Sequence, residues 1–185
     1  METESFMTDV LDACRSSDVP AISCETGDFL AGLVRGHGSR DTLEIGTAHG
    51  YSTLRLAHAI GENGRILTIE FSRPSYEAAR EYFARSGLSG RIEAVFADAL
   101  VHLQAMPTNR TFDSVFVDGE KRRTVEFLDA VWPRIRPGGW IAVDDAIKFR
   151  WKMDGLDGWL ANHACEYCTV RTDPDDGVLV IFPKK

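Results

Sequence analysis

Short apolar runs alternate with amphipathic segments along most of the chain. We expect strands in five of these runs, at residues 41–46, 64–70, 91–98, 111–119 and 140–145. Between them, apolar residues recur at helical spacing, which predicts helices over 50–60, 73–87, 99–106 and 121–139. Strands separated by helices of this length form a parallel sheet, so the pattern predicts a doubly wound α/β fold.

Two positions in the last of these helices bear on where it ends. Pro137-Gly138-Gly139 is a typical helix stop, so we expect the helix to run to that point. Pro133 lies inside the segment and is expected either to bend the helix or to end it early.

The last two apolar runs, residues 166–172 and 177–183, are joined by a turn that is too short for a parallel crossover. They therefore predict an antiparallel hairpin at the end of a seven-stranded, mostly parallel sheet. We expect a single domain, 1–185, with an N-terminal helical segment over 1–40 and the sheet over 41–185. The apolar helix face of Phe6, Met7, Val10 and Leu11 either packs on the domain or forms a homodimer interface.

Charge and composition narrow the class of protein. The 185 residues carry 21 Lys plus Arg against 28 Asp plus Glu, a net charge of −7, which disfavours a nucleic-acid partner. No run approaches the roughly 18 apolar residues of a membrane span, and the acidic opening does not resemble a secretory signal. We read the four cysteines as reduced thiols and expect a cytoplasmic protein.

A glycine turn follows the first strand. Its pattern is Gly46-x-x-x-Gly50, with Thr47 where the dinucleotide fingerprint has its second glycine. That glycine lets a pyrophosphate approach the backbone, and the helix that follows also lacks the Lys-Ser or Lys-Thr pair of a P-loop. A nucleoside without phosphates therefore fits better. Glu44, inside the strand, is expected to brace the turn or to face the ligand's ammonium group through water.

Acidic residues end the next two strands. Glu70 ends the second strand, where a carboxylate can accept hydrogen bonds from both ribose hydroxyls. Asp98 ends the third strand, on the side where an adenine edge would lie. Ligands of such sheets bind outside the carboxyl ends of the strands, so these acids and the glycine turn predict a nucleoside site.

These motifs resemble a known family. "LEIGTAHGYST", "ILTIEF" and "FADAL" look like motifs of class I S-adenosylmethionine-dependent methyltransferases. "FVDGEK" and "IAVDDA" are similar to motifs of the metal-dependent O-methyltransferases of the catechol and caffeoyl-CoA type. The resemblance implies the Rossmann-like methyltransferase fold, S-adenosylmethionine as cofactor, and a divalent cation.

The resemblance also assigns roles to individual residues. Asp118, Asp144 and Asp145 would hold the cation, and Lys121 would be the general base beside Asp118. A cation and a helix start would lower the pKa of Lys121, whereas the carboxylates oppose this shift. The residues implied to contact the cofactor are Glu44, Gly46, Thr47, Gly50, Tyr51, Ser52, Glu70, Phe71, Asp98, Ala99 and Asp118.

The chain departs from the family at the cation site and around the acceptor. The family usually has Asp-Asn at Asp144-Asp145, and a third acid makes Ca²⁺ or Mn²⁺ alternatives to the expected Mg²⁺. The segments before the first strand and after Asp145 are short, which suggests an open acceptor site that Trp151 could wall. Five basic residues near its mouth form either a solvated rim or a site for an anionic substrate: Arg122, Arg123, Lys148, Arg150 and Lys152.

The function predicted from these residues is methyl transfer from S-adenosylmethionine to a hydroxyl of a small acceptor, either catechol-like or another hydroxylated molecule, with help from a divalent cation. The alternatives are a protein that binds S-adenosylmethionine without transfer, or a methyltransferase acting on a macromolecule such as tRNA. A nicotinamide-dependent oxidoreductase is disfavoured by the missing middle glycine.

Overall fold

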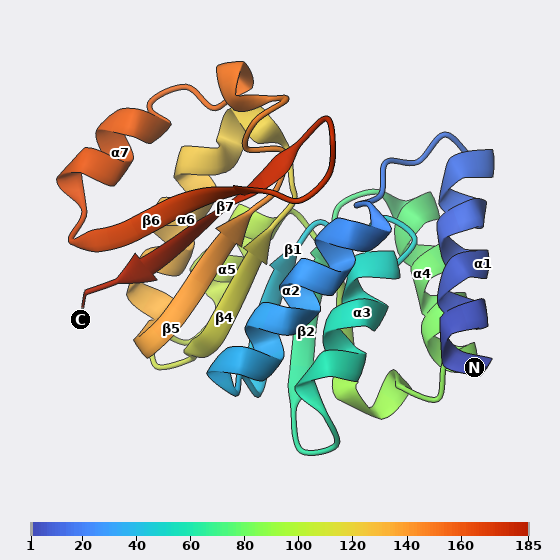
Figure 1. Cartoon of the computed structure of the whole chain (residues 1–185). Helices are drawn as coiled ribbons and strands as arrows, with labels where there is room; N and C mark the ends of the chain where they lie inside the picture. The colour runs from blue at the N-terminus through green and yellow to red at the C-terminus, as the bar shows by residue number, and fades with distance from the viewer. Residues whose placement is uncertain (1, 185) are drawn as a thin grey trace.

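The computed structural model describes residues 2–184, so Met1 and Lys185, the ends of the predicted domain, lie outside the described residues. Its centre is one seven-stranded sheet with the strand order β3-β2-β1-β4-β5-β7-β6 (Figure 1). The strands are β1 (Asp41–Ile45), β2 (Arg65–Glu70), β3 (Ile92–Phe96), β4 (Phe112–Val117), β5 (Ile135–Val143), β6 (Cys165–Arg171) and β7 (Gly177–Pro183). The predicted fold class is confirmed.

The pairing of the strands fixes which of their ends meet. The first five strands pair in parallel, and β1 lies between β2 and β4. β7 is antiparallel to β6, as the short turn predicted. It also pairs antiparallel with β5 and thus lies between β5 and β6. The carboxyl ends of β1 to β5 therefore lie along one edge of the sheet.

Helices cover both faces of the sheet. One face packs against the first four helices and the other against the last three (Figure 1). None of the helices described over residues 2–184 has the length and apolar character needed to cross a membrane. The helices are α1 (Glu2–Ser16), α2 (Cys24–His37), α3 (Tyr51–Ile60), α4 (Arg73–Arg85), α5 (Ala99–Ala105), α6 (Thr124–Val131) and α7 (Leu156–Asn162).

Helix α1 packs on the domain itself. Met7, Val10, Leu11 and Cys14 are all buried within the single chain, and the first three belong to the same apolar core as α3 and α4. Of the two alternatives for this helix face, packing on the domain is the one observed. The surface that suggested a homodimer is therefore already covered.

The helix after Lys121 ends early near Pro133, one of the two outcomes expected of that proline, and the predicted stop at Pro137-Gly138-Gly139 is wrong. The α-helical part stops at Val131, and a 3₁₀ turn over Trp132–Arg134 leads directly into β5. Pro133 sits at the start of that turn, where its missing N–H and its ring prevent continuation of the α-helix. Pro137-Gly138-Gly139 lies within β5, next to an irregularity in the pairing with β4, so it does not stop a helix.

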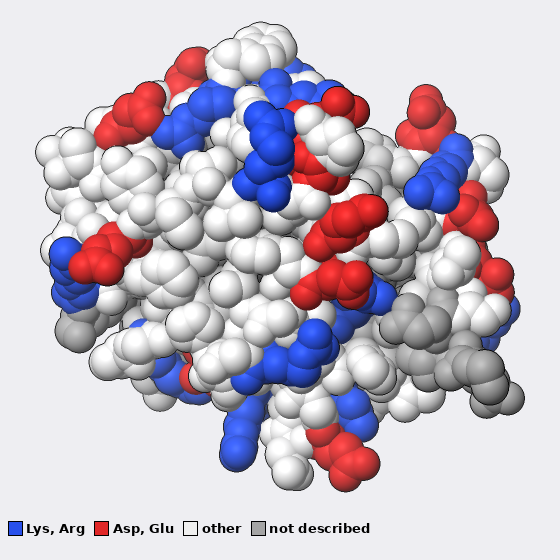
Figure 2. Space-filling model, in the orientation of Figure 1, with Lys and Arg blue, Asp and Glu red and all other residues white. Residues whose placement is uncertain are grey.

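Charges of both signs are spread over the surface. On the face seen in Figure 2, the Lys and Arg side chains (blue) alternate with Asp and Glu (red) around a broad uncharged area. Among the described residues of this face there is no continuous basic strip of the kind that follows a phosphate backbone.

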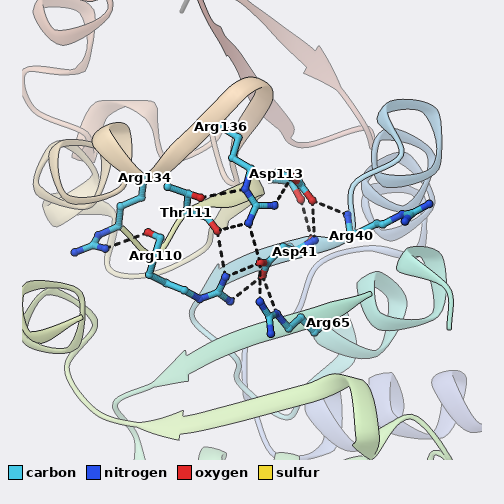
Figure 3. A network of polar contacts seen from close by, with 10 residues as sticks. Arg40, Asp41, Arg65, Arg110, Thr111, Asp113, Arg134 and Arg136 are labelled. Carbon is cyan, nitrogen blue, oxygen red and sulfur yellow. Dashed lines mark hydrogen bonds and ion pairs between the residues drawn. The ribbon is translucent and has the colours of Figure 1, made fainter. Parts of the chain in front are cut away.

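A network of ion pairs ties the amino ends of the strands together (Figure 3). The buried carboxylate of Asp41, at the start of β1, accepts hydrogen bonds from Arg65, Arg110 and Arg136. Asp113 of β4 accepts the backbone N–H of Asp41 and an N–H of Arg136. Burial raises the pKa of Asp41, but the hydrogen bonds from Arg110 and Arg65 outweigh burial and hold it below its usual range.

Candidate active site

A cavity of about 590 Å³ opens at the carboxyl ends of the strands. The turns that follow β1 to β5 form most of its wall. Ligands of such sheets bind at this place, outside the carboxyl ends of the strands. The loop between α1 and α2, Asp18 to Ile22, closes another side. The loop's contribution was not predicted, because its apolar residues follow no helical or strand period.

The glycine turn after β1 lies directly against the end of β4. Gly46 has φ of +93°, and a Cβ at this position would lie 2.4 Å from the backbone oxygen of Asp118. Only glycine combines this conformation with so close an approach. Gly46 thus brings the turn next to the first residue of the acidic cluster described below.

Glu70 braces this turn. One oxygen of its buried carboxylate accepts the backbone N–H groups of Thr47 and Ala48, at 3.0 and 2.9 Å. The other oxygen accepts the N–H of Ser72 at 2.8 Å. The bracing role considered for Glu44 therefore belongs to Glu70, which also lines the cavity.

Glu44 is fully buried beneath the turn and does not line the cavity. Its Oε2 accepts hydrogen bonds from the hydroxyls of Thr53 on α3 and Thr68 on β2. Its Oε1 is buried and receives no hydrogen bond from the described residues. Burial raises the pKa of Glu44 to about 7, against the lowering effect of the hydroxyl donors.

Asp98 begins the helix after β3. Its Oδ1 accepts the backbone N–H groups of Leu100 and Val101, so it caps α5, and its Oδ2 accepts an N–H of Arg123 at 2.7 Å. The hydrogen bond from Arg123 lowers the pKa of Asp98, which keeps this carboxylate charged. Phe71 is largely exposed at the mouth of the same part of the cavity.

Three acids converge at the ends of β4 and β5. Asp118 follows β4, and Asp144 and Asp145 follow β5. One oxygen from each of them can be chosen so that all three lie within 4.8 Å of one another. The two strands pair in parallel up to Val117 and Val143, and the N–H of Asp144 still bonds to the oxygen of Val117, which explains the convergence.

Lys121 lies between two of these acids. Its Nζ is 2.6 Å from Asp118 Oδ1 and 2.9 Å from Asp145 Oδ2. Burial lowers the pKa of Lys121, but the charges of Asp118, Asp145 and Asp144 outweigh burial and raise it above the usual value for lysine. The opposing effects left open by the sequence thus resolve towards a charged ammonium when the acids have no other counter-charge.

The acids lack a full set of counter-charges. Burial, followed by the charge of Asp118, raises the pKa of Asp144 well above its usual range. Burial also raises the pKa of Asp145, although Lys121 opposes this shift. One ammonium faces three carboxylates, and all the ligand atoms are hard oxygens, which are the donors that Mg²⁺, Mn²⁺ and Ca²⁺ prefer. The residues present therefore fit a divalent cation.

The cavity brings together most of the residues singled out in the sequence. Of the residues predicted to bind the cofactor or the cation or to act in catalysis, three do not line it: Glu44, Gly50 and Asp144. Gly50, with φ of +90°, faces the ring of Phe83 and begins α3. The predicted site residues in the cavity wall are Gly46, Thr47, Tyr51, Ser52, Glu70, Phe71, Asp98, Ala99, Asp118, Lys121 and Asp145.

The rim beyond Asp145 is aromatic and basic. Phe149 and Lys152 line the cavity, and the Nζ of Lys152 lies 4.4 Å from the centre of the Phe149 ring. Trp151 is 68% exposed and is not among the lining residues, so Phe149 occupies the place considered for it. Arg150 pairs with Asp157 outside the cavity.

Comparison with known sequences gives a consistent result. A model of the O-methyltransferase family matches residues 9–156. A catechol O-methyltransferase of Mycobacterium tuberculosis is 35% identical over 140 residues, which are 75% of this chain and 63% of that protein. Caffeoyl-CoA O-methyltransferase 2 of Zea mays is 31% identical over 129 residues, 68% of this chain and 49% of that protein. The matched region thus spans less than two thirds of either relative.

A solved structure agrees over nearly the whole chain. The O-methyltransferase TomG of Streptomyces achromogenes, involved in tomaymycin synthesis and solved in complex with SAM, superposes with a TM-score of 0.87 at 27% identity. The match covers 97% of this chain and 90% of that one. The predicted kinship with enzymes of the catechol and caffeoyl-CoA type is confirmed: the chain belongs to the O-methyltransferase family.

Proposed function

We propose that this protein transfers a methyl group from S-adenosylmethionine to a hydroxyl of a small acceptor, with a divalent cation bound at the acidic cluster. The observation that carries the proposal is the convergence of Asp118, Asp144, Asp145 and Lys121 beside the glycine turn. Three of these residues, Asp118, Lys121 and Asp145, line the same cavity as that turn. A nucleoside site and a proton-handling site thus share one chamber.

The cofactor would lie between the glycine turn and the ends of β2 and β3. A carboxylate has about four lone-pair sites, and backbone N–H groups use three of those of Glu70. One site is left for a ribose hydroxyl without loss of the brace, fewer than the two expected from the sequence. Asp98 and Ala99 would lie by the adenine, and Tyr51, Ser52 and Phe71 would line the remainder. TomG, whose structure superposes on this chain, was solved in complex with SAM, which supports the identity of the cofactor.

The cation would be held by Asp118, Asp144 and Asp145, with Mg²⁺ the expected ion and Mn²⁺ or Ca²⁺ as alternatives. When bound, such an ion supplies a positive charge that lowers the pKa of an acceptor hydroxyl and fixes its position. The Nζ of Lys121 holds a proton between Asp118 and Asp145, at the place where the acceptor's proton must leave. Its role as the general base stays a prediction.

The acceptor would be a small hydroxylated molecule, and the names of the catechol and caffeoyl-CoA relatives favour an aromatic hydroxyl. Phe149 offers an aromatic wall beside the acids. We also propose that residues 1–185 act as one domain and that the protein is cytoplasmic, a location supported by its four free cysteines. A homodimer stays a prediction with no surface assigned to it.

The test measures methyl transfer from S-adenosylmethionine to a panel of catechols, with added Mg²⁺ and with EDTA. Calorimetry with S-adenosylhomocysteine and with NAD accompanies it. The variants are Asp144→Ala and, as a control with the same charge change, Asp154→Ala, whose side chain is exposed and does not line the cavity. We expect EDTA and Asp144→Ala to abolish transfer, and Asp154→Ala to leave it unchanged.

Each part of the proposal fails on a separate result. Transfer that survives both EDTA and Asp144→Ala would refute the cation. Binding of NAD without binding of S-adenosylhomocysteine would refute the cofactor. Binding of S-adenosylhomocysteine without transfer to any acceptor of the panel would favour a binding protein or a macromolecular acceptor instead.

A further inference from the structure

The turn between β6 and β7 lies against the loop that follows Asp145. Oδ1 of Asp176 accepts the backbone N–H groups of Ile147 and Lys148, both at 3.1 Å. The N–H of Ala146 bonds to the backbone oxygen of Gly177 at 2.9 Å. Three consecutive N–H groups directly after the acidic pair are therefore held by two adjacent residues of the turn.

These contacts hold Asp145 in an unusual conformation. Its φ is +59°, in the left-handed region that residues other than glycine rarely adopt. Successive side chains of an extended strand point to opposite faces, so Asp144 and Asp145 would diverge if β5 simply continued. The left-handed turn at Asp145 allows both carboxylates to approach Asp118.

The surroundings of the second carboxylate oxygen of Asp176 also connect this residue with the acidic pair. Oδ2 is buried and receives no hydrogen bond from the described residues. The carboxyl groups of Asp176 and Asp145 also lie within hydrogen-bonding reach of each other. Two neighbouring carboxyl groups lower the stability of the fold. A functional requirement for Asp176 at this position would explain why the arrangement is present.

The turn itself is firmly anchored. Oδ1 of Asp173 accepts the N–H of Asp176 at 2.8 Å, and the hydroxyls of Thr172 and Thr26 lie 2.7 Å apart, which joins the turn to α2. Gly177 also packs closely against β6, since a Cβ at this position would lie 2.4 Å from the backbone oxygen of Val170. Asp176 therefore acts from a fixed support.

We propose that Asp176 is a positioning residue for the cation site: its carboxylate holds the loop 146–148 and thereby aims Asp144 and Asp145 at the ion. The inference rests on the proposed cation-assisted function, because it assigns the second sphere of that same site. Partners of this kind, which touch the ligands and not the metal, typically change metal affinity by about 10- to 100-fold when removed.

Mn²⁺ binding provides the test, measured by the loss of the free-ion electron paramagnetic resonance signal in the presence of S-adenosylhomocysteine. The variants are Asp176→Ala, Asp176→Asn and the control Asp175→Ala, an exposed acid of the same turn. We expect Asp176→Ala to weaken Mn²⁺ binding by about 10- to 100-fold. Asp176→Asn keeps an accepting oxygen and should restore most of the affinity, and Asp175→Ala should not change it. Affinity for S-adenosylhomocysteine should be equal in all of them.

Amide hydrogen exchange at Ile147 and Lys148 gives a second measurement that needs no metal. Both N–H groups should exchange faster in Asp176→Ala than in the unaltered protein, and Asp176→Asn should restore their protection. Unchanged Mn²⁺ affinity in folded Asp176→Ala overturns the proposal, and so does an equal loss in Asp176→Asn. A loss of S-adenosylhomocysteine binding that parallels the loss of Mn²⁺ also overturns it, because the role would then be general to the fold.

A failure of the proposed function would give a different result, because the unaltered protein itself would bind no Mn²⁺. The exchange of the two N–H groups alone would then decide whether Asp176 holds the loop. Slow exchange of Ile147 and Lys148 in Asp176→Ala would then reject the positioning role as well.

Discussion

Glu44 is a buried acid with one oxygen that no described residue satisfies. Its pKa rises from 4.5 in the unfolded chain to about 7 in the folded protein. The folded state therefore holds this proton more tightly, so Glu44 destabilises the fold progressively as pH rises from 4.5 to about 7. The full penalty, reached above that pH, is on the order of 3 kcal/mol.

Glu44→Gln removes this pH dependence. Relative to the unaltered protein, we expect the variant to gain stability between pH 5 and 8 by up to about 3 kcal/mol, because glutamine has no proton to lose. Urea unfolding at a series of pH values measures the difference. Parallel stability curves for the two proteins would show that Glu44 does not titrate in this range.

Gly46 sets the distance between the cofactor turn and the acidic cluster. In Gly46→Ala the new Cβ would meet the backbone oxygen of Asp118 at 2.4 Å, at a φ that alanine avoids. We expect weaker binding of S-adenosylhomocysteine and a loss of about 1–3 kcal/mol in stability. Calorimetry and thermal unfolding measure the two effects.

The control for this substitution is Gly32→Ala in α2, where a Cβ meets nothing within 4 Å. Alanine is the better helix former, so this change should be neutral or stabilise by up to about 1 kcal/mol. Equal behaviour of the two variants would mean that the close approach of Gly46 to Asp118 has no consequence.

For single residues, the sequence predicts which of them gather at the site, but not which of their atoms make the hydrogen bonds. Strand ends alone place Glu70, Asp98 and Asp118 on one edge of the sheet. Which carboxylate braces the glycine turn depends on side-chain direction: Glu44 turns inward to two threonine hydroxyls, whereas Glu70 reaches the N–H groups of the turn. Side-chain directions of this kind leave no periodic signal.

At the scale of the elements, the amphipathic helix α1 buries its apolar face within the single chain. Leu11 is 4% exposed within the single chain, in the core shared with α3 and α4. Leu11→Ala should cost about 2–4 kcal/mol, since it leaves a cavity in a packed core. Denaturant unfolding measures the loss, and Asp9→Ala on the exposed side of the same helix should cost close to nothing.

The dependence of the Leu11→Ala stability loss on protein concentration separates packing within the chain from association between chains. A dimer interface would make the loss depend on protein concentration, whereas packing within the chain would not. A loss that disappears on dilution would contradict the packing seen here.

Element types were predictable where the apolar period is clear, and boundaries were not. The hairpin of β6 and β7 follows from the length of its connecting turn. In contrast, Pro137-Gly138-Gly139 looks like a helix stop but lies in β5. The close approach of β5 to β4 requires glycine at 139, where a Cβ would meet the backbone oxygen of Asp113 at 2.6 Å. That contact is between strands and cannot be inferred from local sequence.

Over the whole molecule, the two ends of the sheet serve different purposes. The ion-pair network around Asp41 lies at the amino ends of the strands (Figure 3). The cavity lies at their carboxyl ends. Asp41→Ala leaves Arg65, Arg110 and Arg136 without this shared partner. We expect a loss of about 3 kcal/mol in stability.

The same variant should bind S-adenosylhomocysteine as tightly as the unaltered protein, at temperatures where both are folded. Thermal unfolding and calorimetry provide the two measurements. Weaker cofactor binding by folded Asp41→Ala would contradict the separation of the two ends.

The position of β7 has a consequence for synthesis on the ribosome. This strand pairs with β5 and β6, and the turn before it supplies Asp176 and Gly177 to the loop after Asp145. The strands that carry the glycine turn, Glu70 and Asp98 are all translated earlier. A nascent chain can therefore build this part of the cavity wall first, but its acidic cluster cannot take its final geometry until residues 176–183 have left the exit tunnel. Methyl transfer should accordingly begin only after residues 176–183 have emerged and paired with β5 and β6.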